Sequence, residues 1–420
     1  MSVAEEGAPA GEVGATPQRA WVRPTFGRRI KWRLEQGIYV AFEAALGVLP
    51  LIWLAGFGRA LGGVAYRIFP RRRRTVERNL RIAFAGERAP EELKVMAQEV
   101  FRRSGANLLC SFGTAGKDPA TTVDTLTMHG EERLRDALAP GKGVVLVIAH
   151  MGNWEAMAQW LPRLIPPGVK AANIYRPLNN PWLDARVLAT RSRQGLRLFS
   201  KDESPLAMAA FVRAGGVLSI MSDQRAGIAG ELVPFFGRIT SATPLPAILA
   251  RRTGAALLGV SLRTRSTGRW ALEFHAPEEV HLPTAGVMRF LEQIMRVSAE
   301  DVFWFQDRWR SGRKAPQRLD GRVARGEVPA ASKWRRVLLW ADAAGQWPIA
   351  PAAVPADVRY ERTGRAEDGD WQRAPGEAVR AFLERIDSGA VLPLDYVVGG
   401  GAEVRAACRG LGLGWVEGTA

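Results

Sequence analysis

The most informative part of the sequence for the fold is GVVLVIAHMGNWE, residues 143–155. Its first seven residues, Gly143–Ala149, are apolar and rich in β-branched side chains. Such a run is typical of a strand that is buried on both faces of a sheet. After His150 and a short turn, Trp154–Leu164 has the spacing of a helix. A buried strand that leads directly into a helix indicates an α/β domain.

Further segments of the same two kinds alternate along the chain. The predicted strands are Lys170–Tyr175, Val217–Met221, Ala256–Leu262 and Trp270–Phe274. The predicted helices between them are Pro181–Gln194, Ser204–Ala214 and Pro244–Thr253. This alternation predicts an α/β fold with a mostly parallel central sheet flanked by helices. The active site of such a sheet lies at the carboxyl ends of its strands.

The chain is strongly basic, with a formal net charge of +16. Between Arg19 and Arg103, 18 basic residues outnumber 7 acidic ones, so this part alone carries +11. A basic surface needs an anionic partner, which is nucleic acid, anionic lipid or an acidic protein. Composition alone does not choose among the three.

An apolar segment, Gly37–Phe57, follows the first basic residues. It is just long enough for a membrane span, although it contains Glu43 and Pro50. Tryptophan and arginine precede it and the run Arg71–Arg74 follows, as is usual beside an anionic leaflet. We therefore predict that residues 19–75 seat the protein on a membrane, as a span or an interfacial helix. A buried core helix, with Arg71–Arg74 as a solvated charge run or nucleic-acid signal, is the alternative.

The two ends of the chain differ from the middle. Residues 1–18 are rich in Ala, Gly, Glu and Pro and are predicted to be disordered. After a linker at Gly321–Ser332, residues 333–420 are nearly neutral and contain five tryptophans. This C-terminal extension is predicted to be a small appended unit, and the sequence assigns it no role.

The first candidate site is the turn after the best strand. His150 lies there, at the catalytic edge of the predicted sheet, and Glu155 is in the first turn of the next helix. We predict that Glu155 folds back and orients the imidazole, which then acts as a base on a substrate hydroxyl. Backbone N–H groups near Gly152 would stabilise an oxyanion. Gly152 and Asn153 are therefore candidate substrate-binding residues.

Three other motifs follow at later strand ends. Arg176 ends one strand in Tyr-Arg-Pro, and its guanidinium suits a phosphate. Asp223 and Gln224 follow another strand and are further candidates for binding substrate. The apolar turn Val233–Gly237 is either core or the lining of an acyl channel. Taken one at a time, Arg176 is equally explained by a salt bridge and Asp223 by a turn cap.

The order of these motifs resembles the lipid A late acyltransferases, the lauroyl- and myristoyltransferases of Gram-negative bacteria. The likeness covers residues 37–315, including Trp304–Trp309. It implies a fold like that of glycerol-phosphate acyltransferases over residues 76–320. It implies His150 and Glu155 as the catalytic pair, with Arg176 and Asp223 as further active-site residues. The implied donor is acyl–acyl carrier protein, and the implied acceptor is a hydroxyl of a phosphorylated glycolipid on the cytoplasmic face of the inner membrane.

Two alternatives stay open. A related group acylates phosphatidylinositol mannosides from acyl-CoA, and the core is compatible with it. A non-enzymatic protein that binds anionic membrane or nucleic acid is the rival from another class. No helix-turn-helix is evident in the sequence, so a nucleic-acid partner is not expected. Neither GxSxG, HExxH, a P-loop nor a strand-linked GxGxxG occurs, and the proposed chemistry needs no metal or cofactor.

Overall fold

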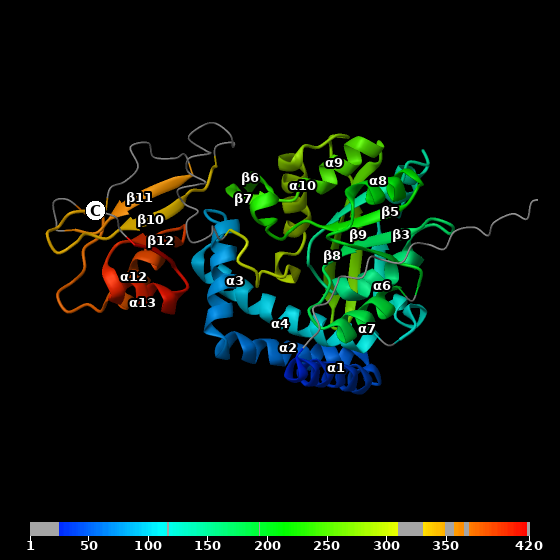
Figure 1. Ribbon diagram of the computed structural model, residues 1–420, viewed down its shortest axis with the longest axis horizontal. Coiled ribbons are helices and arrows are strands. Elements are labelled where there is room, and N and C mark those ends of the chain that lie inside the picture. The colour runs from blue at the N-terminus through cyan, green and yellow to red at the C-terminus, as the bar shows by residue number, and fades with distance from the viewer. Residues whose placement is uncertain are drawn as a thin grey trace, which may run out of the picture.

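A computed structural model describes residues 25–115, 117–192, 194–309, 331–348, 357–364 and 369–417. The segment predicted to be disordered, residues 1–18, lies outside these ranges, as does most of the predicted linker. The chain forms a large α/β part and, beside it, a smaller C-terminal part with its own sheet (Figure 1).

The large part is built on a seven-stranded sheet of order β1-β9-β8-β2-β5-β3-β4. Strands β8, β2, β5, β3 and β4 are parallel, while β9 is antiparallel to β8 and pairs in parallel with β1. The bounds are β1 Leu126–His129, β2 Val144–Ile148, β3 Ala171–Tyr175, β4 Arg197–Ser200, β5 Val217–Met221, β8 Ala256–Ser266 and β9 Arg269–His275. All five residues of β2 are buried at the centre. The predicted mostly parallel sheet is therefore confirmed.

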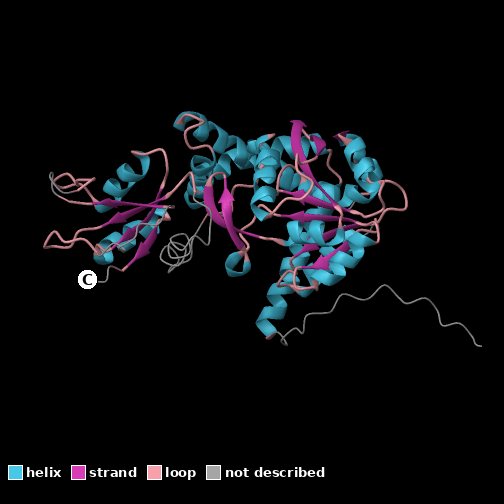
Figure 2. Cartoon of the chain, turned by 90° about the horizontal axis from the view of Figure 1, so that it is seen from above, coloured by secondary structure: helices cyan, strands magenta, loops and turns pink. Residues whose placement is uncertain are grey.

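Helices cover both faces of this sheet (Figures 1 and 2). One layer contains α6 (Trp154–Leu164) and α7 (Pro181–Ser192), against which α4 (Pro90–Ala115) and α1 (Phe26–Gly47) pack. The other contains α8 (Pro205–Arg213), α9 (Leu245–Thr253) and α10 (Thr284–Arg296). A short helix, α5 (Glu131–Leu138), lies between β1 and β2 in the chain.

The predicted apolar segment Gly37–Phe57 is not one helix. The chain breaks at Val48–Pro50, so that α1 ends at Gly47 and α2 runs over Leu51–Ile68. Within the described residues, no helix has the length and apolar character needed to cross a membrane. Glu43 does not face solvent, because it is buried and its Oε2 lies 3.0 Å from Nη2 of Arg186.

A row of glycines packs α2 closely against α4. A Cβ atom on Gly62 would lie 2.1 Å from the carbonyl oxygen of Phe101, and one on Gly58 would lie 2.5 Å from that of Gly105. The two helices therefore approach at backbone distance, which only glycine allows.

The opposite sides of α1 and α2 carry large apolar side chains that stay 44–79% exposed within the described chain. We call this set the apolar stripe. Its members are Phe26, Ile30, Leu34, Ile38, Phe42, Ile52, Trp53, Phe57, Leu61, Val64 and Ile68. On α1 they recur every four residues, so they lie along one face of the helix. An exposed apolar surface of this extent marks an interaction site.

The Val233–Gly237 turn does not line a channel. It joins β6 (Glu231–Phe235) to β7 (Arg238–Ala242) in a hairpin. Phe235 and Phe236 are fully buried and pack on Trp304 and Trp309. The core reading of this motif is therefore correct.

The C-terminal extension folds as a four-stranded parallel sheet of order β11-β10-β12-β13. The bounds are β10 Arg335–Leu339, β11 Val358–Arg362, α12 Val379–Ser388, β12 Leu394–Val398, α13 Gly401–Leu411 and β13 Gly414–Val416. Residues such as Leu338, Phe382 and Leu394 form a separate hydrophobic core. The extension lies next to α3 (Pro70–Ala83) and the β6–β7 hairpin (Figure 1).

Candidate active site

Three candidate residues follow three neighbouring strands. His150 comes shortly after β2, Asp223 after β5 and Arg176 after β3, and these strands are adjacent and parallel in the order β2-β5-β3. The carboxyl ends of parallel strands meet at one edge, so strand order brings these residues to the same side of the sheet.

The imidazole of His150 lies between Asp223 and Gln224. Its Nδ1 is 2.7 Å from Oδ1 of Asp223, and its Nε2 is 3.1 Å from the side-chain nitrogen of Gln224. The backbone N–H of His150 also donates to Oδ2 of Asp223 at 3.2 Å. The ionised carboxylate of Asp223 accepts a hydrogen bond from the Nδ1–H of His150, so Nε2 is left as the acceptor and takes the hydrogen bond of the Gln224 amide.

Electrostatics favour the ionised carboxylate and a basic imidazole. Burial lowers the pKa of His150, but the charge and hydrogen bond of Asp223 outweigh it, so the pKa lies above its usual value. Burial raises the pKa of Asp223, but the charge of His150 and its two hydrogen bonds bring it below its ordinary value. The pair is therefore matched for proton transfer at Nε2.

The turn after His150 depends on Gly152 and Asn153. Gly152 has a φ of +57°, and a Cβ atom there would lie 2.4 Å from the carbonyl oxygen of Leu262. Its N–H donates to the carbonyl of Asp301 at 2.9 Å, so this N–H is not free for an oxyanion. Asn153 is buried and caps α6 by accepting from the N–H of Ala156. The N–H groups of Ala156 and Met157 are already bonded to Asn153, so within the first turn of α6 those of Trp154 and Glu155 are the remaining oxyanion donors.

Glu155 does not contact the imidazole in the structure. Both of its oxygens accept from Arg191 of α7, at 2.7 Å from Nη2. The prediction that Glu155 orients the ring is therefore wrong for this structure, because Asp223 occupies Nδ1. Glu155 still contributes, less than Asp223, to raising the pKa of His150. Sequence reasoning missed Arg191, since nothing local distinguishes it among the arginines of α7.

Arg176 is exposed at the end of β3. Within the part of the chain that the structure describes, no carboxylate lies within ion-pair distance of it. The salt-bridge interpretation of Arg176 is thus not supported, and its guanidinium is available at the catalytic edge.

An apolar cavity of about 440 Å³ begins beside Glu155 and extends between α2 and α4. Near the site it is lined by Gly152, Asn153, Trp154 and Phe303, and further away by Leu61, Ala65, Phe101 and Leu108. Leu61 also belongs to the apolar stripe. The volume is within the range of small-molecule sites, about 300–1,000 Å³. No cluster of metal-binding side chains is found among the described residues.

These features suit removal of a proton from a substrate hydroxyl beside an apolar chain. The comparisons agree with this class of chemistry. The chain belongs to the bacterial lipid A biosynthesis acyltransferase family, whose model matches residues 28–311, and it is therefore an acyltransferase. The C-terminal extension lies beyond the matched residues.

The chain is similar to two kinds of acyltransferase. The chain is 26% identical over 290 residues to the lipid A biosynthesis lauroyltransferase of Escherichia coli, covering 67% of this chain and 92% of the relative. It is 26% identical over 148 residues to a lipid A biosynthesis acyltransferase of Haemophilus influenzae, covering 35% of this chain and 46% of that one. It is 32% identical over 132 residues to the phosphatidylinositol mannoside acyltransferase of Mycobacterium tuberculosis, covering 31% and 41%.

Proposed function

We propose that this acyltransferase moves a fatty acyl chain from acyl–acyl carrier protein to a hydroxyl of a lipid A precursor at the cytoplasmic face of the inner membrane. The observation that carries the proposal is the apolar cavity. Gly152, two residues after His150 in the sequence, lines one part of it, and Leu61 of the apolar stripe lines another. A cavity between a base and an exposed apolar surface suits an acyl chain whose reacting end faces the imidazole.

The residues present support a direct transfer. The acceptor hydroxyl takes the place of Gln224 at Nε2 of His150 and gives up its proton as it attacks the thioester carbonyl. Asp223 stabilises the imidazolium that forms, because it already holds Nδ1 at 2.7 Å. The N–H groups of Trp154 and Glu155, at the start of α6, stabilise the oxyanion. When the tetrahedral intermediate collapses, the C–S bond breaks and the imidazolium returns the proton to the thiolate.

Charged residues at the same edge fit a phosphorylated acceptor. Arg176 has no ion-pair partner within the described residues, and Arg191 is bonded to Glu155, which lines the cavity. A guanidinium binds phosphate through a planar fork of donors. An acidic carrier protein suits the net charge of +16.

The apolar stripe supports seating on the membrane surface. Trp53 and Phe57 are 66% and 60% exposed, and Arg67 and Arg71 follow nearby in the sequence. An apolar helix face with basic neighbours is typical of an interfacial helix on anionic lipid. The seat would bring the cavity to the lipid acceptor without a membrane span.

A second acceptor is favoured by one specific observation, the 32% identity to a phosphatidylinositol mannoside acyltransferase. The longer match to the lauroyltransferase supports the lipid A acceptor more strongly. The test is a competition in which purified full-length protein receives a lipid A precursor and a phosphatidylinositol mannoside together, with acyl–acyl carrier protein or acyl-CoA. Mass spectrometry should find the acyl chain on the lipid A precursor. Acylation of the mannoside alone, or from acyl-CoA alone, would overturn the corresponding half of the proposal.

A further inference from the structure

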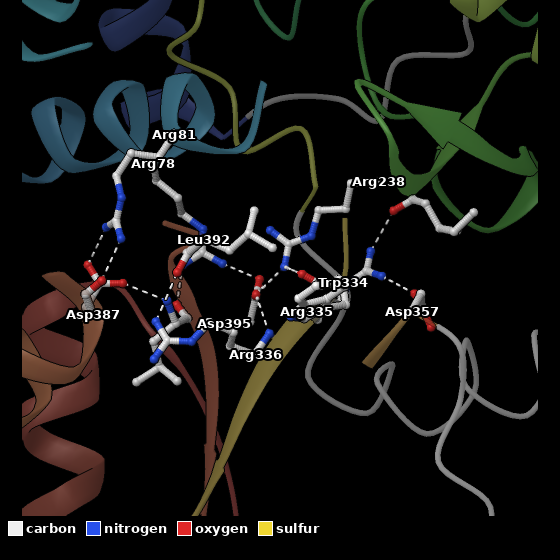
Figure 3. A network of polar contacts seen from close by, with 12 residues as sticks. Arg78, Arg81, Arg238, Trp334, Arg335, Arg336, Asp357, Asp387, Leu392 and Asp395 are labelled. Atoms are coloured by element: carbon white, nitrogen blue, oxygen red, sulfur yellow. Dashed lines mark hydrogen bonds and ion pairs between the residues drawn. The ribbon is translucent and has the colours of Figure 1, made fainter. Parts of the chain in front are cut away.

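Asp395 joins the C-terminal extension to two separate elements of the acyltransferase part. It lies on β12, and its carboxylate accepts hydrogen bonds from Arg78 of α3 and from Arg238 of β7 (Figure 3). It also accepts from the backbone N–H of Arg336 at 3.1 Å. Burial raises the pKa of Asp395, but the charges of Arg238, Arg78 and Arg335 outweigh it and lower the pKa. The carboxylate is therefore ionised and fully partnered, as a buried charge requires.

Other residues of the extension, such as Asp387 and Arg335, contact either α3 or β7, but not both. On α3, Arg81 donates to Asp387 at 2.9 Å (Figure 3). Arg74, also on α3, donates to the carbonyl of Gly410. On β7, the carbonyl of Ile239 accepts from Arg335 at 2.7 Å. Arg74 of the Arg71–Arg74 run thus contacts the extension, so the run is not simply a solvated basic cluster.

The α3 contact leads toward the active site. Asn79, next to Arg78, is buried, and its side-chain amide donates to the carbonyls of Trp304 and Gln306 at 2.8 and 2.6 Å. The N–H of Phe303 in turn donates to the carbonyl of His150 at 2.8 Å. The helix that Asp395 holds therefore fixes the segment that contacts His150.

The contact between Asp395 and Arg238 of β7 is connected to the surroundings of Asp223, the partner of His150. Thr240 lies two residues after Arg238. Its hydroxyl donates to the carbonyl of Arg308 at 2.9 Å and accepts from Nη1 of Arg308 at 2.8 Å. Nη1 of Arg308 also donates to the carbonyl of Ser241, which accepts from the N–H of Ala226 as well. Ala226 follows Asp223 by three residues.

Arg308 is buried, and its Nε and Nη2 have no hydrogen-bond partner among the described residues. Its charge is among the causes that lower the pKa of Asp223. Residues 303–309 thus run from His150 to the surroundings of Asp223, and both α3 and β7 hold them.

We propose that the C-terminal extension is a positioning unit for the acyltransferase site, in which Asp395 holds α3 and β7 together and so fixes residues 303–309 against His150 and the Asp223 loop. Asp395 touches neither substrate nor the reacting atoms, and it acts through Asn79, Thr240 and Arg308. The inference rests on the proposed roles of His150 and Asp223.

The test compares Asp395→Asn with Asp387→Asn in the full chain. Both variants remove one interface charge, but only Asp395 contacts β7 as well as α3. Asp395→Asn should lower kcat about tenfold with little change in KM, because small misplacements far from the chemistry cost up to about 100-fold. Asp387→Asn should stay within about twofold of wild type, since it leaves the β7 contact in place.

A second readout does not need the acyl transfer assay. The chain has four histidines, so ¹⁵N-histidine NMR can follow the His150 imidazole, with His150→Ala as the assignment control. Asp395→Asn should lower the pKa of His150, and Asp387→Asn should leave it unchanged. If no donor supports transfer by wild-type protein, the proposed function fails, and this titration still decides the positioning role.

Thr240→Val keeps the experiment decisive if Asp395→Asn does not fold. Thr240 belongs to β7, and its hydroxyl bonds Arg308 and no residue of the extension among the described residues, so the variant should reproduce both losses while the contacts of Asp395 stay in place. In the double variant the two losses should not add. A folded Asp395→Asn or Thr240→Val protein with wild-type kcat and His150 titration overturns the inference, as does an equal loss in Asp387→Asn.

Discussion

Nδ1 of His150 lies 2.7 Å from Oδ1 of Asp223, although 73 residues separate them in the chain. They meet because β2 and β5 are neighbours and parallel, and each residue follows the end of its strand. Glu155, which is only five residues from His150, pairs with Arg191 of another helix. Strand order, not closeness in sequence, decides the partner of the imidazole.

The His150–Asp223 pair gives the first prediction. His150→Ala should reduce acyl transfer about 10²-fold or more, the usual effect of removing a general base. Because Asp223 raises the pKa of His150, Asp223→Asn should lower it, and the pH at which kcat/KM reaches half its plateau should fall with it. The measurement is a pH–rate profile of folded variants. An unshifted profile in Asp223→Asn would mean that Asp223 does not tune the base.

The first prediction also covers stability, because the same pair sets how the free energy of unfolding depends on pH. The folded pKa of His150 is raised, so its contribution is full below its unfolded value of about 6.5 and declines as pH rises through the folded value. Wild type should therefore lose more unfolding free energy than His150→Gln as the pH rises above about 6.5 and the folded imidazole titrates. Chemical denaturation at each pH measures this, and parallel curves would contradict it.

The Glu155–Arg191 pair gives the second prediction. Glu155→Gln weakens a bidentate contact at the cavity mouth and Arg191→Lys removes its planar fork, so each should reduce kcat/KM about tenfold or more. Because the residues act on each other, the double variant should lose little more than the worse single one. Initial rates of the three proteins test this. Additive losses would show that the two residues act independently.

The cavity gives the third prediction. Ala65→Trp fills space that an acyl chain would take and should shift the preference toward shorter donors. Ala60→Trp is the matched control, since Ala60 is exposed on the same helix and does not line the cavity. Competition among saturated acyl donors of increasing length provides the measurement. An unchanged preference in a folded Ala65→Trp protein would place the acyl chain elsewhere.

The apolar stripe gives the fourth prediction. Trp53→Glu combined with Phe57→Glu should weaken binding to phosphatidylethanolamine–phosphatidylglycerol vesicles at least about tenfold, because two apolar side chains lose their burial in lipid. Leu206→Glu, on α8, changes an equally exposed apolar residue outside the stripe and should bind as wild type. Vesicle flotation distinguishes the two. Equal binding by all three proteins would show that the apolar stripe does not bind the membrane surface.

Arg176 gives the fifth prediction. Arg176→Ala should raise KM for a phosphorylated acceptor about tenfold or more, and Arg176→Lys should recover only part of the loss because lysine lacks the planar fork. All three proteins should have a similarly high KM for a dephosphorylated acceptor. Rates against acceptor concentration provide the measurement, and wild-type KM in both variants would assign the phosphate to another group.

The sequence alone determined the local elements of the large part. The run Val144–Ile148 is a strand because it is apolar and β-branched throughout, and Trp154–Leu164 is a helix with the bounds that its pattern predicts. The motifs at the strand ends also identified the family, since they keep their order along the chain. These features depend on residues a few positions apart, which a periodic pattern can report.

Tertiary structure alone decided which side chains meet. Nδ1 of His150 bonds Asp223 and not Glu155, and Glu155 bonds Arg191. Asp395 bonds both α3 and β7. Each of these contacts joins segments that are far apart in the sequence. The predicted apolar segment is likewise divided at Val48–Pro50 into two helices, and the glycines of the second helix, α2, pack on α4. Such pairings follow from strand order and helix packing, and the free energy that selects them comes from burial across the whole fold, which no local pattern records.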